Sequence, residues 1–193
     1  MTDALYKPML AFLMEAGIGD LSHTGKTYLG HLIAVHRLLL ERGFGPDVCR
    51  AGMFHSIYGT EAFQGFKLPL DRRPDLRRLI GDLAERLAYL NCAMDRASFD
   101  AVLALPGPPY SMRDRLTSDV VPLSPDEIDD LCRVHLYDWL EQVPRSHRGY
   151  EYRRAAYRRM AERLGDAAVA DYDRVFAAEQ SATADQSSSP GVA

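Results

Sequence analysis

The chain has 193 residues, enough to bury a substantial core, and its 47% apolar and 26% charged residues are ordinary for a globular protein. The formal net charge of −4 gives no electrostatic reason to bind nucleic acid or an anionic membrane, so we expect neither partner. No apolar run approaches the roughly 20 residues that span a bilayer, and the N-terminus lacks a secretory signal pattern. We therefore expect a cytoplasmic protein.

Three helices are predicted in the first third of the chain, where apolar residues recur at helical spacing in residues 4–16, 26–42 and 46–55. The last of these begins at Gly45-Pro46-Asp47, which is typical of a helix start because proline suits the first position and an acid suits the first turn. Gly59 is expected to end the segment that follows.

The remaining helices are predicted over residues 75–94, 125–142, 149–164 and 166–179. The second of them has the clearest start, because Ser124-Pro125-Asp126-Glu127 forms a capping box with proline at the first helical position. Residues 113–121 favour a short extended segment, and no strand alternation is long enough to build a sheet.

These patterns predict an all-α fold, a single-domain bundle of six or seven helices over residues 1–179. Residues 180–193 are rich in Ser, Ala and Thr, a composition that cannot bury enough surface to fold, so we expect a disordered tail. Cys49, Cys92 and Cys132 lie far apart among apolar neighbours without a Cys-x-x-Cys pair, which indicates buried reduced thiols.

A metal centre is suggested by His31, His55 and Asp95, which each lie on or at the end of a separate predicted helix. Helices in a bundle can each project one ligand inward, and imidazole with carboxylate suits iron, manganese or zinc. His36 cannot join His31, because five residues turn a helix by roughly 140°. The alternative is chance, since a chain with six histidines readily supplies such a combination.

The segment from His55 to Glu61 gathers reactive side chains at the end of an apolar helix. Sites are usually built this way, because the core fixes the backbone while the side chains reach a cavity. Ser56, Tyr58 and Glu61 are therefore the candidate catalytic groups. Each also has a structural alternative, as a hydroxyl bonded to a helix carbonyl, a packed phenol and a surface acid respectively.

Candidate substrate-binding residues flank these groups on both sides. His23 and Lys26 precede the helix that carries His31, and they are candidates to face the same cavity. Arg96 follows Asp95 at the end of a later helix, where the alternative is a local ion pair between the two.

A resemblance to the HD-domain superfamily adds to these observations. It rests on a helix with His31, then Ala51-Gly52-Met53-Phe54-His55-Ser56-Ile57-Tyr58-Gly59-Thr60-Glu61, then Leu90-Asn91-Cys92-Ala93-Met94-Asp95-Arg96. The segment is similar to the hydrolase domain of stringent-response nucleotide enzymes and to uncharacterised HD-like proteins with the same His-Ser-Ile-Tyr-Gly-Thr-Glu run. The resemblance implies an all-α, HD-like domain in which His31, His55 and Asp95 hold a metal.

The chain departs from the family pattern at three positions. Ser56 stands where the family has the aspartate of its His-Asp pair, and Gly59 and Thr60 stand where the related hydrolases have two acids. The paired aspartate often bridges two metals, so its absence argues against a dinuclear centre. One metal held by two histidines and one aspartate remains, a ligand set shared with mononuclear non-haem iron enzymes.

The leading hypothesis is a small-molecule enzyme on an HD-like scaffold, with one divalent transition metal, iron or manganese ahead of zinc. Its reaction is either hydrolysis or an oxygen-dependent oxidation. The alternatives are a metal-free site that works by acid and base chemistry through His55, Tyr58 and Glu61, and a non-catalytic module that senses a ligand or holds a protein partner. The substrate, reaction type and oligomeric state are left open.

Overall fold

Helices dominate the computed structural model, which describes residues 3–19, 22–23 and 26–187. Within these ranges the α-helices are α1 (Tyr6–Glu15), α2 (Tyr28–Glu41), α3 (Pro46–Met53), α4 (Arg73–Ile80), α5 (Asp82–Ala93), α6 (Arg96–Val102), α7 (Pro125–Gln142), α8 (Arg154–Leu164) and α9 (Asp166–Ser187). The predicted all-α class is confirmed in this coarse form, although the described residues contain more helices than the six or seven expected.

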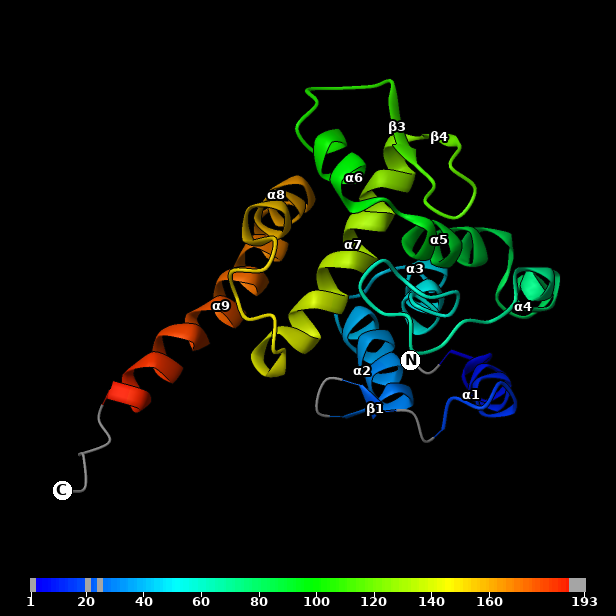
Figure 1. Ribbon diagram of the computed structural model, residues 1–193, viewed down its shortest axis with the longest axis horizontal. Helices are drawn as coiled ribbons and strands as arrows, with labels where there is room; N and C mark the ends of the chain where they lie inside the picture. Colours follow the sequence, from blue (N-terminus) through cyan, green and yellow to red (C-terminus); the bar gives the residue numbers. More distant parts are fainter. Residues whose placement is uncertain (1–2, 20–21, 24–25, 188–193) are drawn as a thin grey trace.

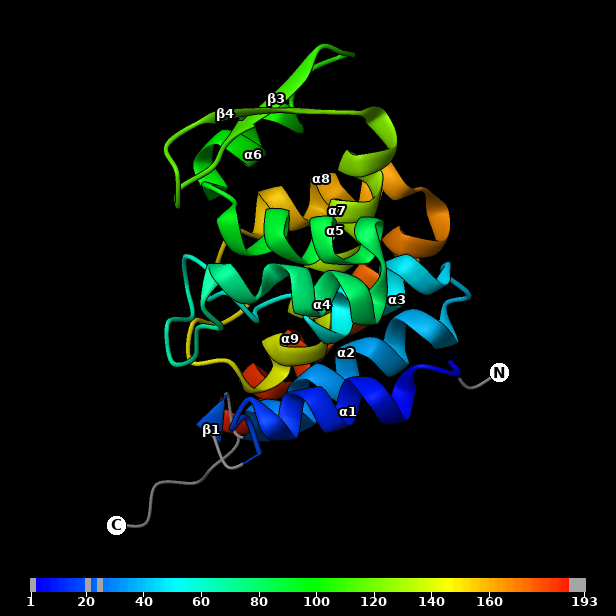
Figure 2. The ribbon, with the colours of Figure 1, turned by 90° about the vertical axis from the view of Figure 1, so that its right-hand side faces the viewer.

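The remaining elements are short. Two antiparallel hairpins pair β1 (Ser22–His23) with β2 (Lys26–Thr27), and β3 (Tyr110–Arg113) with β4 (Val120–Leu123); two 3-10 turns are η1 (Leu70–Arg72) and η2 (Val143–Arg145). The β3–β4 hairpin lies beside α6 at one end of the molecule, and α1 lies at the other end (Figure 2).

The helix predicted over residues 75–94 is two helices, α4 and α5, that meet at Gly81. Gly81 has φ of +95°, a conformation that side-chain-bearing residues rarely adopt, so the chain changes direction there. The apolar spacing is helical on both sides of the glycine, and this continuity hides the break from the sequence.

Two further segments differ from the prediction. α6 was not expected, and it forms because the Asp95 carboxylate caps its first turn. The predicted boundary at residue 179 is not the end of an element, because α9 continues to Ser187; residues 188–193 lie outside the described residues. In contrast, α7 has its predicted bounds, and its capping box is confirmed by reciprocal bonds between Ser124 and Glu127.

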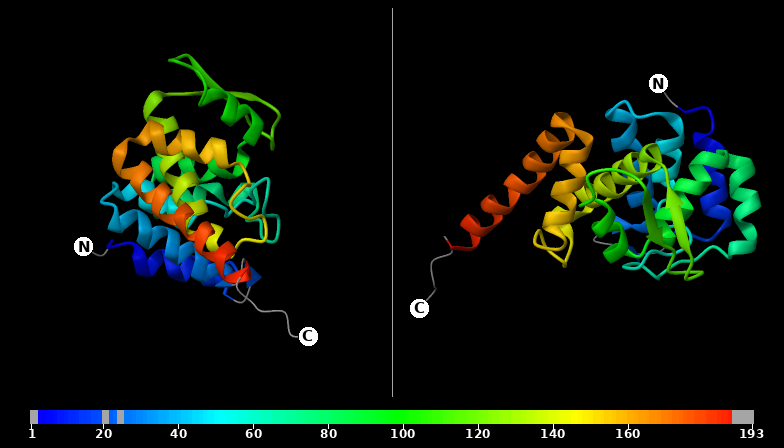
Figure 3. Two further views of the ribbon diagram at one scale, coloured as in Figure 1. Left: turned by 90° about the vertical axis from the view of Figure 1, so that its left-hand side faces the viewer. Right: turned by 90° about the horizontal axis from the view of Figure 1, so that it is seen from above.

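α7 is the central element of the fold (Figure 1). It packs against α2, α3 and α5 on one side and against α8 on the other, and α8 pairs in turn with α9. Seen from above, the α8–α9 pair lies apart from the other helices with α7 between them (Figure 3). Side chains on different faces of α7 can therefore reach both groups of helices.

The buried core runs through this arrangement. Cys49, Cys92 and Cys132 are buried within it and form no disulfide, as expected for reduced thiols. Across the described part of the chain, no helix is both long and apolar enough to cross a bilayer.

α2 and α3 pack closely against each other at Gly52. A Cβ atom placed on Gly52 would lie 2.2 Å from Leu39 Cδ1 and 3.4 Å from Val35 Cγ1. The absence of a side chain at Gly52 therefore sets the distance between these helices, and α2 carries His31 while α3 leads directly to His55.

We expect Gly52→Ala to lower the free energy of unfolding by about 1–3 kcal/mol, because overpacking outweighs the gain in helix propensity. Chemical denaturation measures the change. Gly107→Ala is the matched control, since nothing lies within 4 Å of its Cβ position, and it should have little effect. Combining Gly52→Ala with Leu39→Ala should cost less than the sum of the single changes; strict additivity would contradict this contact.

Candidate metal centre

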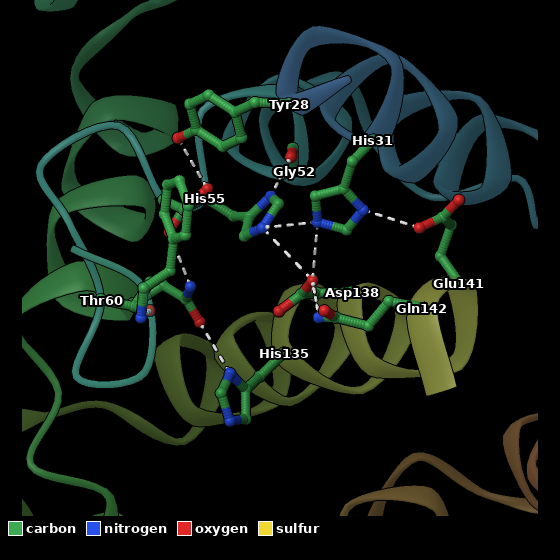
Figure 4. Close-up of polar contacts among 12 residues, drawn as sticks. Tyr28, His31, Gly52, His55, Thr60, His135, Asp138, Glu141 and Gln142 are labelled. Atoms are coloured by element: carbon green, nitrogen blue, oxygen red, sulfur yellow. Dashed lines mark hydrogen bonds and ion pairs between the residues drawn. The ribbon is translucent and has the colours of Figure 1, made fainter. Parts of the chain in front are cut away.

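Three buried side chains from separate helical segments converge beside α7 (Figure 4). His31 belongs to the first turns of α2, His55 follows the end of α3, and Asp138 lies in the second half of α7. Their exposed fractions are 0%, 2% and 6% respectively. The mutual packing of α2, α3 and α7 brings them together.

The potential ligand atoms face one another at short distances. Asp138 Oδ1 lies 3.1 Å from His31 Nε2 and 3.3 Å from His55 Nε2, and the two Nε2 atoms are 3.3 Å apart. One ligand atom from each residue lies within 4.8 Å of the others, so this cluster could hold a metal ion. Two imidazoles and one carboxylate suit a first-row transition metal.

The outer nitrogen of each imidazole is fixed by an acceptor. His55 Nδ1 donates to the Gly52 carbonyl at 2.7 Å, and His31 Nδ1 donates to Glu141 Oε2 at 2.6 Å. These bonds place the Nδ1 protons on the outside, so both Nε2 atoms point toward Asp138, where each could bind a metal once it has lost any proton it carries. A metal-ligating histidine usually donates its other N–H in this way.

The two carboxylates that contact His31, those of Asp138 and Glu141, have polar partners of their own. Arg145 pairs with Glu141, and the Gln142 side-chain amide donates to Asp138 Oδ1 at 2.8 Å. Burial would lower the pKa of His31, but the hydrogen bonds and charges of Asp138 and Glu141 outweigh it and raise this pKa to about 9. Burial would raise the pKa of Asp138, but His55 and His31 hold it well below its usual range.

Asp138, and not the predicted Asp95, completes the cluster found among the described residues. Asp95 instead caps α6, where its Oδ1 accepts the Ser98 backbone N–H at 2.8 Å. The sequence did contain a signal for Asp138: it lies three residues after His135 and seven after Leu131, on the buried face of α7. An acid on such a face needs a buried partner.

The predicted catalytic groups do not converge. Ser56 lies beside the cluster and its Oγ is 2.9 Å from the Tyr28 hydroxyl, with both side chains buried. Tyr58 points elsewhere and donates to Glu85 Oε1 at 3.0 Å. Glu61 is exposed and accepts the Arg96 backbone N–H at 2.9 Å.

Of the three predicted substrate-binding residues, the structure places one, Arg96, at the cavity. Arg96 lines a cavity at the cluster, and its guanidinium donates to the Tyr152 hydroxyl. His23 and Lys26 belong to β1 and β2, and their side chains lie outside the described residues.

The cavity gives the cluster an open side. It has a volume of about 340 Å³, and His55 and Asp138 form part of its wall. The other residues that line it are Ser56, Thr60, Ala62, Phe63, Arg96, Trp139, Gln142, Ser146, His147, Arg148, Tyr152 and Tyr157. Half of the lining residues come after residue 138, in a part of the chain whose sequence did not indicate a connection with the site.

Another buried histidine, His135, links the cluster to α8. Its Nδ1 donates to Asn91 Oδ1 at 3.1 Å, and Asn91 Nδ2 donates to the His55 carbonyl at 2.7 Å. Arg153, at the start of α8, donates to His135 Nε2 at 2.7 Å and pairs with Asp100. His135 is thus a core histidine with both nitrogens satisfied, and it anchors the backbone of His55.

One of three comparisons with known proteins gives a match, and it covers part of the chain. A family model described as a domain of unknown function, DUF6817, matches residues 12–96. The matched range contains His31 and His55 and ends before Asp138. The search of curated proteins found no match, and neither did the search of solved structures.

If Tyr58 has a structural role, replacing it should lower the free energy of unfolding while leaving the candidate metal ligands in place. Glu85 is fully buried and binds Arg73 at 2.7 Å as well as Tyr58. We expect Tyr58→Phe to cost about 1 kcal/mol, and Glu85→Ala about 3 kcal/mol because it leaves Arg73 unpaired. Glu151→Ala, which removes an exposed acid, should cost little. Denaturation curves measure all three; an unchanged curve for Glu85→Ala would contradict this role.

His135 should make stability depend on pH. Burial and the nearby Arg153 hold the pKa of His135 well below its usual value. In the unfolded chain the same imidazole takes up a proton at about pH 6.5. Above that pH neither state is protonated; below it only the unfolded state is, so stability falls by up to about 1.4 kcal/mol per pH unit. Denaturation of the wild type and of His135→Gln between pH 7.5 and 5 should show a steeper fall in the wild type. Parallel profiles would contradict it.

Proposed function

We propose that the protein is a metal-dependent small-molecule enzyme, with one divalent transition metal bound by His31, His55 and Asp138. The observation that carries this proposal is the convergence of three ligand atoms whose outer partners leave both Nε2 atoms facing Asp138 Oδ1. The cavity beside His55 and Asp138 offers room for a substrate. The helical scaffold and the two histidines support an HD-like origin.

Each ligand of such a site would be oriented by a different neighbouring group. Glu141 and the Gly52 carbonyl orient the two imidazoles, and Gln142 orients the carboxylate. A bound metal would supply Lewis acidity to activate a water molecule for hydrolysis or, if it is iron(II), electrons to activate dioxygen for oxidation. A single carboxylate favours a mononuclear centre, in keeping with Ser56 in place of a second acid.

The metal-free alternative has less support. It needs His55, Tyr58 and Glu61 to act on one substrate as acid, base and hydrogen-bond donor. Tyr58 is bonded to Glu85 in the core and Glu61 is on the surface, so these three side chains do not share a cavity. If no metal binds, we would instead interpret the protein as a non-catalytic module that senses a ligand or holds a protein partner.

Metal analysis of protein purified without a histidine tag tests the proposal. We expect about one equivalent of iron(II) or manganese(II) per chain, and we expect His55→Ala and Asp138→Asn each to weaken binding by more than about 100-fold. Asp95→Ala is the matched control, because Asp95 caps α6 instead. Binding that depends on Asp95 but not on Asp138 would overturn the ligand assignment, and substoichiometric metal unaffected by His55→Ala would overturn the centre itself.

The reaction class can then be assigned with the loaded protein. Oxygen consumption with iron(II) indicates an oxygenase, whereas phosphate release under manganese(II) indicates a hydrolase. Asp138→Asn should abolish whichever activity is found, since it removes a ligand while keeping the shape of the side chain.

A further inference from the structure

The wall of the cavity is positively charged away from Asp138. Arg96 and Arg148 both line it, the first 91% buried and the second exposed at its mouth, with His147 beside it. Among the described residues that line the cavity, Asp138 is the only carboxylate. With a divalent metal beside Asp138, the cavity would carry a net positive charge.

The two arginines have no acid of their own. No carboxylate of the described chain forms an ion pair with Arg96 or Arg148, whereas Arg145 and Arg153 nearby are paired with Glu141 and Asp100. A buried guanidinium is costly unless a negative charge or several acceptors match it. Arg96 is therefore placed to receive an anion.

Both guanidinium groups lie beside the same phenol ring. The Arg96 and Arg148 Cζ atoms are 5.8 Å and 4.7 Å from the centroid of Tyr152. The Tyr152 hydroxyl accepts a hydrogen bond from Arg96, so its own proton is available to a ligand. Two cations and a hydroxyl donor gathered at one residue of the cavity wall are a suitable set for an oxyanion.

Another part of the cavity wall is aromatic. Phe63, Trp139 and Tyr157 line the cavity, and the indole of Trp139 stacks on Tyr157 with the ring planes 7° apart. The buried indole N–H of Trp139 has no acceptor within the described part of the chain. A flat apolar group fits against such rings.

We propose that the cavity binds a small anionic molecule, whose carboxylate or phosphate group lies between Arg96 and Arg148 and whose flat apolar part packs on Phe63 and Trp139. This inference names the substrate class of the proposed enzyme and rests on that function for its catalytic meaning. The arginine pair itself does not depend on a metal, so anion binding can be measured separately.

The test is calorimetric titration of the full chain with benzoate, phenyl phosphate and the neutral benzamide, in metal-free and manganese(II)-loaded protein. We expect at least one of the two anions to bind both forms, and benzamide to bind at least about tenfold more weakly. The stronger of the two anions identifies the group as carboxylate or phosphate. Equal binding of benzamide would overturn the proposal.

Arginine variants distinguish the cavity from the metal as the source of binding. Arg148→Gln removes an exposed charge that folding does not need, and we expect it to weaken the better anion about tenfold; Arg96→Lys, which keeps the charge but loses the planar donor pair, should also weaken it. Arg113→Gln, an exposed arginine outside the cavity, is the matched control and should have no effect.

The two proposals can fail separately. If manganese(II) binds but neither anion does, the anion site is wrong and the metal centre stands. If the anions bind only loaded protein and Arg148→Gln and Arg96→Lys leave that binding unchanged, the metal alone holds them and the anion site is again wrong. If the anions bind through the arginines while no metal binds, the anion site stands and the enzyme proposal fails.

Discussion

The buried carboxylate of Asp138 is the charge that the packing around α7 has to accommodate. A carboxylate at this depth is unfavourable unless positive charge and hydrogen bonds match it. His31, His55 and the Gln142 amide supply that match, and they come from α2, from the end of α3 and from α7 itself. The close approach of α2 to α3 at Gly52 is what allows both imidazoles to reach one oxygen.

The surroundings of the cluster fix its geometry from two directions. Glu141, near the end of α7, holds His31 and is itself paired with Arg145 of η2. The chain of bonds through Asn91, His135 and Arg153 holds the backbone at His55 and ties it to α8. Ligands held by such outer partners lose little freedom when a metal binds, which favours a defined coordination geometry.

The cavity complements this centre in charge. Asp138 contributes one negative charge, and Arg96 and Arg148 contribute two positive charges that no acid of the described chain cancels. Ser56, which also lines the cavity, adds no negative charge, because its side chain is a neutral hydroxyl bonded to Tyr28. With Asp138 as the single carboxylate among the described lining residues, the charge of the cavity is compatible with an anionic ligand.

Local sequence patterns predicted the helical class and the bounds of α7, because apolar spacing and capping residues act within a few turns of chain. Residue type and order also indicated His31 and His55 as candidate metal ligands. The break between α4 and α5 at Gly81 was not predicted, because the apolar pattern is helical on both sides of the glycine. Only the tertiary structure decided that Asp138 joins the histidines, that Asp95 caps a helix and that Tyr58 binds Glu85. These roles depend on which helices pack together, and a carboxylate or phenol leaves the same local pattern whichever distant partner it finds.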